Sequence, residues 1–276
     1  MLPQLKKFFL PAVLLMTISV EKSYGNGVGF YEIQTGWGSF KDLQLPYYGD
    51  EFNAPGPYRA DGVSISTDSG THYGFPIDLN ITYRWFEANY GVDLSLGVMF
   101  LKHLYGDEEA TFSSFQSSNV TIKPFSKGYF LKVPRRIGGV IQYKRNDYFN
   151  VGSGHSISGL MVGGFLQVGS LKKIRVEVQA TKNVSSEFSY SSGSYFDSPK
   201  FDGQESRQHN IKFGLSKHLG SRIIGLVNFE MDSVDVKIND INSYEKFGFV
   251  ISPYQPTSKS YNLDSQILSF GLRKLF

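Results

Sequence analysis

Ten charged residues are placed where they could act on an ion or on one another inside the protein. Each lies on the polar face of a segment in which apolar and polar residues alternate. The acids are Glu32, Asp78, Asp93, Glu177 and Glu230, and the bases are Arg84, Lys144, Arg175, Lys212 and Arg273. If these faces enclose one space, charges of both signs must pair or stay hydrated. The pattern therefore predicts either a salt-bridge network that fills a lumen or a narrow polar pore whose charges tune selectivity.

The histidines raise a third possibility, which is hydrolysis. Four of the five lie in or beside long segments between the alternating stretches: His72, His103, His155 and His209. A base and a nucleophile on one strand need i, i+2 spacing, so that both side chains point to the same side. His155 has serines only at +1 and +3, which an extended strand turns to its other face. The spacing therefore favours a protein that is not an enzyme, with no catalytic, cofactor-binding or metal-binding residue.

Ten segments with period-two alternation must position these side chains. The clearest is 76–86, where Ile77 and Leu79 oppose Asp78 and Asn80. Pro124 interrupts the fourth segment, and residues 134–136 are predicted as the turn into the fifth. The ten segments are 27–40, 76–86, 92–100, 120–133, 137–147, 155–168, 174–181, 209–217, 222–236 and 261–276.

The last segment runs to the end of the chain and finishes on an aromatic residue. Ser269, Gly271 and Phe276 match the C-terminal pattern of bacterial outer-membrane β-barrels, whereas Lys274 replaces an apolar residue of that pattern. The chain thus resembles that family. The resemblance implies that these three residues form an assembly signal read by the barrel-assembly machinery. It also implies a location in the bacterial outer membrane, in contact with its lipid and lipopolysaccharide.

Short and long connections alternate along the chain. The short ones are 87–91, 134–136, 169–173 and 218–221; the long ones are 41–75, 102–119, 183–207 and 237–260, with 148–154 of intermediate length. Outer-membrane barrels show this asymmetry, with short periplasmic turns and long extracellular loops. The short connections are rich in Lys and Arg, and the long ones in Asp and Glu. The pattern predicts that both termini lie on the short-turn side.

The composition and the N-terminal residues further limit the location of the protein and the chemistry that it can carry out. Residues 1–25 are predicted as a secretory signal peptide, with Lys6 and Lys7 before an apolar run over 8–20. Residues 26–276 are predicted as a single barrel domain. The chain has no cysteine, which excludes disulfides and cysteine-bound zinc. A net charge of +3 gives no indication of nucleic-acid binding.

Two segments admit alternative interpretations. Short apolar stretches around Val234–Ile238 and Phe247–Ile251 would give twelve strands, although their length favours a hairpin that rises from the rim. Residues 185–196 alternate Ser with Tyr and Phe, which is typical either of a partner-binding loop or of a strand that extends above the membrane.

The family that the chain resembles includes the omptin proteases, which are ten-stranded and use an acid pair and an Asp-His pair, each at i, i+2. Here Arg207 stands two residues before His209, and no Asp-x-Asp occurs. The prediction is therefore a transmembrane antiparallel up-and-down β-barrel of ten strands with a structural or surface-interaction role. A narrow pore for small solutes is the alternative, and an outer-membrane hydrolase acting on protein or lipid is the third.

Overall fold

The protein is described by a computed structural model that covers residues 27–41, 71–106, 114–150, 153–192, 200–220, 222–246, 249–251 and 259–275. None of these residues forms a helix long and apolar enough to cross a membrane. The strands are β1 (Gly27–Lys41), β2 (Thr71–Phe86), β3 (Tyr90–Gly106), β4 (Ser114–Phe130), β5 (Val133–Asn150), β6 (Ser153–Gly169), β7 (Arg175–Ser192), β8 (Lys200–Gly220), β9 (Ile223–Lys246), β10 (Phe249–Ile251), β11 (Lys259–Asn262) and β12 (Ser265–Leu275).

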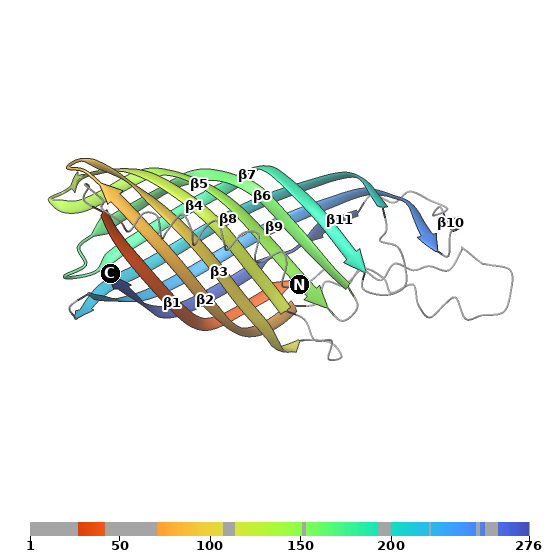
Figure 1. The fold of residues 1–276 in the computed structure, drawn as a ribbon, viewed down its shortest axis with the longest axis horizontal. Helices are drawn as coiled ribbons and strands as arrows, with labels where there is room; N and C mark the ends of the chain where they lie inside the picture. The colour runs from red at the N-terminus through yellow and green to blue at the C-terminus, as the bar shows by residue number, and fades with distance from the viewer. Residues whose placement is uncertain are drawn as a thin grey trace.

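Ten of these strands form a closed antiparallel ring (Figure 1). β1 to β9 pair in chain order, and β12 closes the ring by pairing with β1 on one side and β9 on the other. Closure leaves no open strand edge, so every strand can satisfy its backbone groups within the sheet. The predicted up-and-down barrel of ten strands is confirmed.

The alternative of twelve barrel strands is wrong, because two short strands lie outside the ring. β10 pairs with residues 244–246 at the far end of β9, as a hairpin that rises from the rim would. β11 pairs with residues 235–238 of β9 and continues the line of β12. Val234 and Val236 belong to β9 itself, since this strand runs on for 24 residues.

The outer surface of the ring is apolar, while the inner faces carry most of the buried polar side chains. Such an extent of exposed apolar surface is stable against lipid rather than water. Large apolar residues that are more than a third exposed occur on every ring strand, for example Tyr31, Ile33, Ile77, Leu79, Leu94, Phe100, Ile122, Ile141, Tyr143, Leu160, Leu166, Val176, Phe213, Leu215, Ile223, Phe270 and Leu272. The alternation read from the sequence therefore assigns the two faces correctly.

The two ends of the barrel differ. Residues 87–89, 131–132 and 170–174 connect strands at one end, which is on the left in Figure 1, and β8 is followed by β9 at the same end; we call it the tight-turn end. β1 begins and β12 ends there. At the opposite end, here called the outer end, β9 extends beyond the other strands and carries β10. In outer-membrane barrels the tight turns are periplasmic.

Two predicted turns are misplaced, since residues 218–220 of the predicted 218–221 turn belong to β8. The β4–β5 connection lies at Leu131 and Lys132, with φ of 47° and 65°, and residues 134–136 belong to β5. A two-residue hairpin whose residues both have positive φ is usually built from Asn and Gly, so Leu-Lys carries no turn signal. Pro124 does not interrupt β4 either; it lies within the strand and pairs with Val92.

Several strands extend past the predicted segments. β3 runs to Gly106, β7 to Ser192 and β9 to Lys246, so strands occupy much of what was predicted as 102–119, 183–207 and 237–260. A membrane crossing needs about 9–11 residues. The surplus lies at the outer end, and residues 185–192 are a strand extension rather than a loop. The predicted signal peptide lies outside the described residues.

Gly271 allows a close approach at the seam between β12 and β1. A Cβ added there would lie 2.2 Å from the backbone oxygen of Ile33. We expect Gly271→Ala to destabilise the barrel by about 1–3 kcal/mol, because the seam must widen. Urea unfolding in detergent, followed by heat-modifiable gel mobility, would measure the change.

Gly139→Ala is the matched control for this substitution. Its added Cβ would have no neighbour closer than the 3.8 Å to Pro124 Cγ, so we expect little change. Equal unfolding midpoints for the two alanine variants would contradict the role of the seam.

Candidate functional site

Three groups of inward-facing side chains follow one another along the lumen, beside a small apolar cluster of Phe125, Val140 and Phe165. The inner ion-pair layer, nearest the tight turns, contains Glu32, Arg84, Asp93, Lys123, Glu177 and Arg273. The central network is built around Lys144, Glu230 and Asp232. The outer apolar cluster lies toward the outer end. These three groups are the candidate functional site, because they decide whether anything passes through the barrel.

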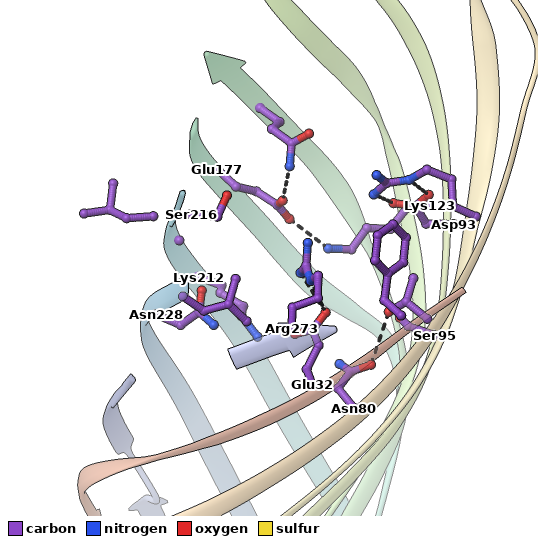
Figure 2. A pocket seen from close by; sticks show the side chains of 17 residues that line it. Glu32, Asn80, Asp93, Ser95, Lys123, Glu177, Lys212, Ser216, Asn228 and Arg273 are labelled. Atoms are coloured by element: carbon purple, nitrogen blue, oxygen red, sulfur yellow. Dashed lines mark hydrogen bonds and ion pairs between the residues drawn. The ribbon is translucent and has the colours of Figure 1, made fainter. Parts of the chain in front are cut away.

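The inner ion-pair layer joins three acid–base pairs (Figure 2). Arg84 donates through Nε and Nη2 to both carboxylate oxygens of Asp93, at 2.5 and 2.6 Å. Such a bidentate pair fixes both position and orientation. The guanidinium also lies 5.1 Å from the ring centroid of Phe30, where a cation–π attraction adds to the pairing. Both charged groups are nearly buried, so neither depends on bulk water.

The other two pairs bring different strands together. Arg273 of β12 contacts the Glu32 carboxylate of β1 at 2.7 Å across the seam. Lys123 of β4 contacts Glu177 of β7 at 3.0 Å, reaching over two intervening strands. Gln167 of β6 donates to the same carboxylate at 2.7 Å. A cavity of about 80 Å³ remains among these groups, room for only a few water molecules.

The central network crosses the lumen. Lys144 of β5 contacts Glu230 at 2.9 Å and Asp232 at 3.1 Å, both on β9. At least three strands separate β5 from β9 in either direction around the ring, so these bonds bridge opposite walls. The side chains of Lys144 and Asp232 are only 3% and 2% exposed. A lysine buried between two carboxylates is compensated electrostatically, and removal of any member would leave an unpaired charge.

Amide side chains complete the central network. Asn146 donates to Asp232 at 2.7 Å, and Gln208 donates to the same carboxylate at 3.0 Å. Asn210 donates to Glu230 at 2.8 Å, and the hydroxyl of Ser117 donates to Asn146 at 2.8 Å. The two carboxylates therefore accept hydrogen bonds from several strands, and this satisfies most of their acceptor capacity.

The outer apolar cluster has no counterpart in the sequence-based predictions. Aromatic rings pack through it: Phe40 stacks on Phe115 with centroids 5.5 Å apart, and Phe115 lies tilted against Tyr148 with centroids 5.0 Å apart. Offset and edge arrangements at these distances are attractive beyond simple burial. Its buried members are Phe40, Met99, Leu101, Phe115, Tyr148, Ile157, Phe188, Val234, Val236, Leu263 and Ile267.

Eight of the ten charged residues predicted for the lumen form ion pairs. Lys212 makes the longest contact, 3.6 Å to Glu230. Asp78 and Arg175 form no ion pair with any residue that the structure describes. The sequence-based prediction missed two residues that form ion pairs with these charges, Lys123 and Asp232. Asp232 lies two residues after Glu230, so the alternation of β9 already placed it inside; Lys123 was obscured by the neighbouring Pro124.

The residues of the predicted assembly signal have separate roles in the structure. Ser269 faces the lumen and donates to Gln34 at 2.9 Å across the seam. Gly271 leaves room for the β1 backbone, as described above. Phe276 lies outside the described residues. Lys274, which departs from the family pattern, is exposed on the outer face beside the tight-turn end.

Neither His155 nor His209 is placed beside a nucleophile on its own strand face. His155 is buried in the lumen and stacks on Tyr148, with ring centroids 4.4 Å apart. The next residue, Ser156, lies on the opposite face, where its hydroxyl contacts that of Ser189 at 2.6 Å. His209 points outward from β8 and is exposed. In the described part of the chain, no three His, Cys, Asp or Glu residues are grouped to hold a metal ion.

Comparisons with known proteins give only distant structural likenesses. No protein-family model matches the chain, and no curated protein does. Among solved structures, Neisserial surface protein A is 10% identical, with 89% of this chain and 96% of that chain covered and a TM-score of 0.33. The translocator domain of autotransporter NalP from Neisseria meningitidis is 9% identical, with 98% and 96% covered and a TM-score of 0.36. The outer membrane protein OprG from Pseudomonas aeruginosa is 13% identical, with 91% and 98% covered and a TM-score of 0.31.

These matches transfer no activity, ligand or partner to this chain. The architecture rests on the molecule itself. Its strands close into one antiparallel ring of ten, its outer surface is apolar, and its tight turns all lie at one end. This is the architecture of an outer-membrane β-barrel.

Removing the Lys144 charge tests how far the central network holds the barrel together. We expect Lys144→Met to lower the free energy of unfolding by about 3–5 kcal/mol, because Glu230 and Asp232 would lose their shared cation in a buried site. Urea titration in detergent, followed by tryptophan fluorescence, would measure the loss. Lys172→Met, at an exposed turn position, should change stability little, and equal losses in both variants would contradict the cross-lumen role.

Proposed function

We propose that the protein is a sealed outer-membrane barrel whose function is structural or lies at its outer surface, rather than a pore. The observation that carries the proposal is the Lys144 bridge from β5 to Glu230 and Asp232 on β9. The Lys144 side chain reaches across the lumen and is only 3% exposed, which supports a lumen that is closed at that level.

The outer apolar cluster supports the same conclusion from a second position. An ion that entered from the outer end would have to leave water for a site lined by Phe40, Phe115 and Tyr148, all at most 2% exposed. Transfer of an ion into an apolar surrounding without compensating ligands is strongly unfavourable. The two barriers lie in series along the lumen, so loss of one would leave the other in place.

With the lumen closed, the surfaces left for contact with other molecules are the rims and the projecting strands. β7, β8 and β9 extend well past the length that a bilayer crossing requires. The exposed hydroxyl group of Ser189 lies on the β7 extension, where it contacts the Ser156 hydroxyl of β6. These strands support a surface-interaction role at the outer end. Lipopolysaccharide and outer-membrane lipid would surround the barrel, and the barrel-assembly machinery would insert it.

Single-channel recording in a planar bilayer tests the sealed lumen. We expect the processed wild-type protein to show no stepwise conductance. Lys144→Ala alone and Phe115→Ala with Tyr148→Ala should also remain silent, since each removes one barrier. The triple variant removes both barriers, and we expect it to conduct.

Tyr143→Ala with Arg145→Ala is the matched control on β5, because these residues flank Lys144 and point outward. Heat-modifiable gel mobility would show that each variant is folded before recording. Reproducible unitary steps from the folded wild-type protein would contradict the proposal and favour a narrow pore for small solutes.

A further inference from the structure

A basic pocket opens at the tight-turn end of the lumen. Its volume is about 330 Å³, and four of its lining side chains are cationic: Lys127 of β4, Arg135 and Arg136 of β5, and Arg175 of β7. No carboxylate is found among its lining residues in the part of the chain that the structure describes. We call these four residues and the space between them the basic mouth. Three separate strands supply its charges, so the fold gathers them from distant parts of the sequence.

The charges of the basic mouth are not balanced by the neighbouring ion pairs. Arg84, Lys123 and Arg273 of the inner ion-pair layer each have their own carboxylate. In contrast, neither Arg136 nor Arg175 forms an ion pair or a side-chain hydrogen bond with any residue that the structure describes. Like charges held this close repel one another, and an anion placed between them would relieve that repulsion.

Arg136 provides a second and independent observation. Its Nη1 atom is buried and has no hydrogen-bond partner among the described residues. A buried N–H group without an acceptor is costly, so such atoms usually mark the place of a ligand or water. The guanidinium is also held over the ring of Phe125, with 5.0 Å between its central carbon and the ring centroid. The donor is therefore positioned before any ligand arrives.

The other two cations of the basic mouth, Lys127 and Arg135, differ in the contacts that they make. Lys127 donates to the backbone oxygen of Glu87 at 2.8 Å and lies over the ring of Phe86. The Glu87 carboxylate accepts the hydroxyl of Tyr90 and is not part of the pocket lining. Arg135 is exposed at the rim. Two arginines with unused guanidinium donors thus lie beside two further cations.

We propose that the basic mouth binds a phosphate group from the tight-turn side of the membrane. Phosphate presents several acceptor oxygens and up to two negative charges, which matches a set of planar arginine donors and multiple cations. A single carboxylate would use fewer of these donors and neutralise less of the charge. The phosphate can belong to a phospholipid headgroup of the adjacent leaflet or to a soluble molecule, and both sources share this chemistry.

The test measures phosphate binding to the processed full-length barrel in a maltoside detergent, which itself contains no phosphate. One arm titrates inorganic phosphate by calorimetry at constant ionic strength. The other arm uses native mass spectrometry to compare retention of dioleoyl phosphatidylglycerol with that of dioleoylglycerol, which lacks the phosphate. We expect saturable binding of one equivalent in at least one arm. Binding only in the first arm identifies a soluble source, and binding only in the second identifies a headgroup.

Arg136→Gln with Arg175→Gln should weaken that binding at least tenfold, because both unpaired guanidinium groups are lost. Lys172→Gln with Lys173→Gln is the matched control, since it removes two charges from an exposed turn at the same end without touching the pocket. Arg136→Lys with Arg175→Lys keeps the charge and loses the planar donors, so we expect an intermediate affinity.

Two results would overturn the proposal. One is no saturable binding by the wild type in either arm. The other is an equal loss of affinity in the pocket variant and the turn control, which would mean diffuse attraction to a basic rim. A measurement on the wild-type protein does not depend on whether a variant folds. We expect phosphate to raise the melting temperature of the wild-type protein more than chloride does at equal ionic strength. No difference between the two anions would count against the site.

Discussion

Ring closure is the constraint on which the rest of the molecule depends. In lipid, a strand with an open edge leaves unpaired N–H and C=O groups at a cost of several kcal/mol for each group. β12 removes both open edges at once by pairing with β1 and with β9, which are far apart in the sequence. The seam is tight, since the backbone of Ile33 occupies the space beside Gly271. The end of the chain is therefore a structural requirement of the whole ring.

Ring closure also determines which side chains face the lumen and how they are solvated. Alternate residues of every ring strand point into a lumen that side chains of a small barrel can fill. Charges that face inward have little bulk water and no lipid headgroups to solvate them, so most of those in the middle of the lumen are paired. The bonds from Lys144 to Glu230 and Asp232 meet that need and at the same time connect opposite walls. Thus the polar filling contributes to the rigidity of the ring that encloses it.

Much of this architecture follows from alternation in the sequence, because a strand between lipid and a polar lumen must change polarity at every residue. That rule gave the ring strands, their faces and most of the paired charges. It failed at the outer end, where the strands are apolar on the inner face. Phe40, Phe115 and Tyr148 turn inward above the membrane, and nothing in the local pattern separates them from lipid-facing residues. The Leu131–Lys132 turn was hidden for a related reason, since tertiary pairing imposes positive φ on residues with no turn preference.

Pairing across the lumen could not be predicted either, because it depends on register and strand tilt rather than on sequence spacing. Lys123 and Glu177 are 54 residues apart and lie on strands that are not neighbours. The result is an electrically asymmetric interior. In the central network two carboxylates, Glu230 and Asp232, share Lys144, whereas Arg136 and Arg175 at the tight-turn end form no ion pair with any described residue. An apolar cluster toward the outer end and arginines without ion-pair partners among the described residues at the tight-turn end therefore give the lumen two chemically different ends.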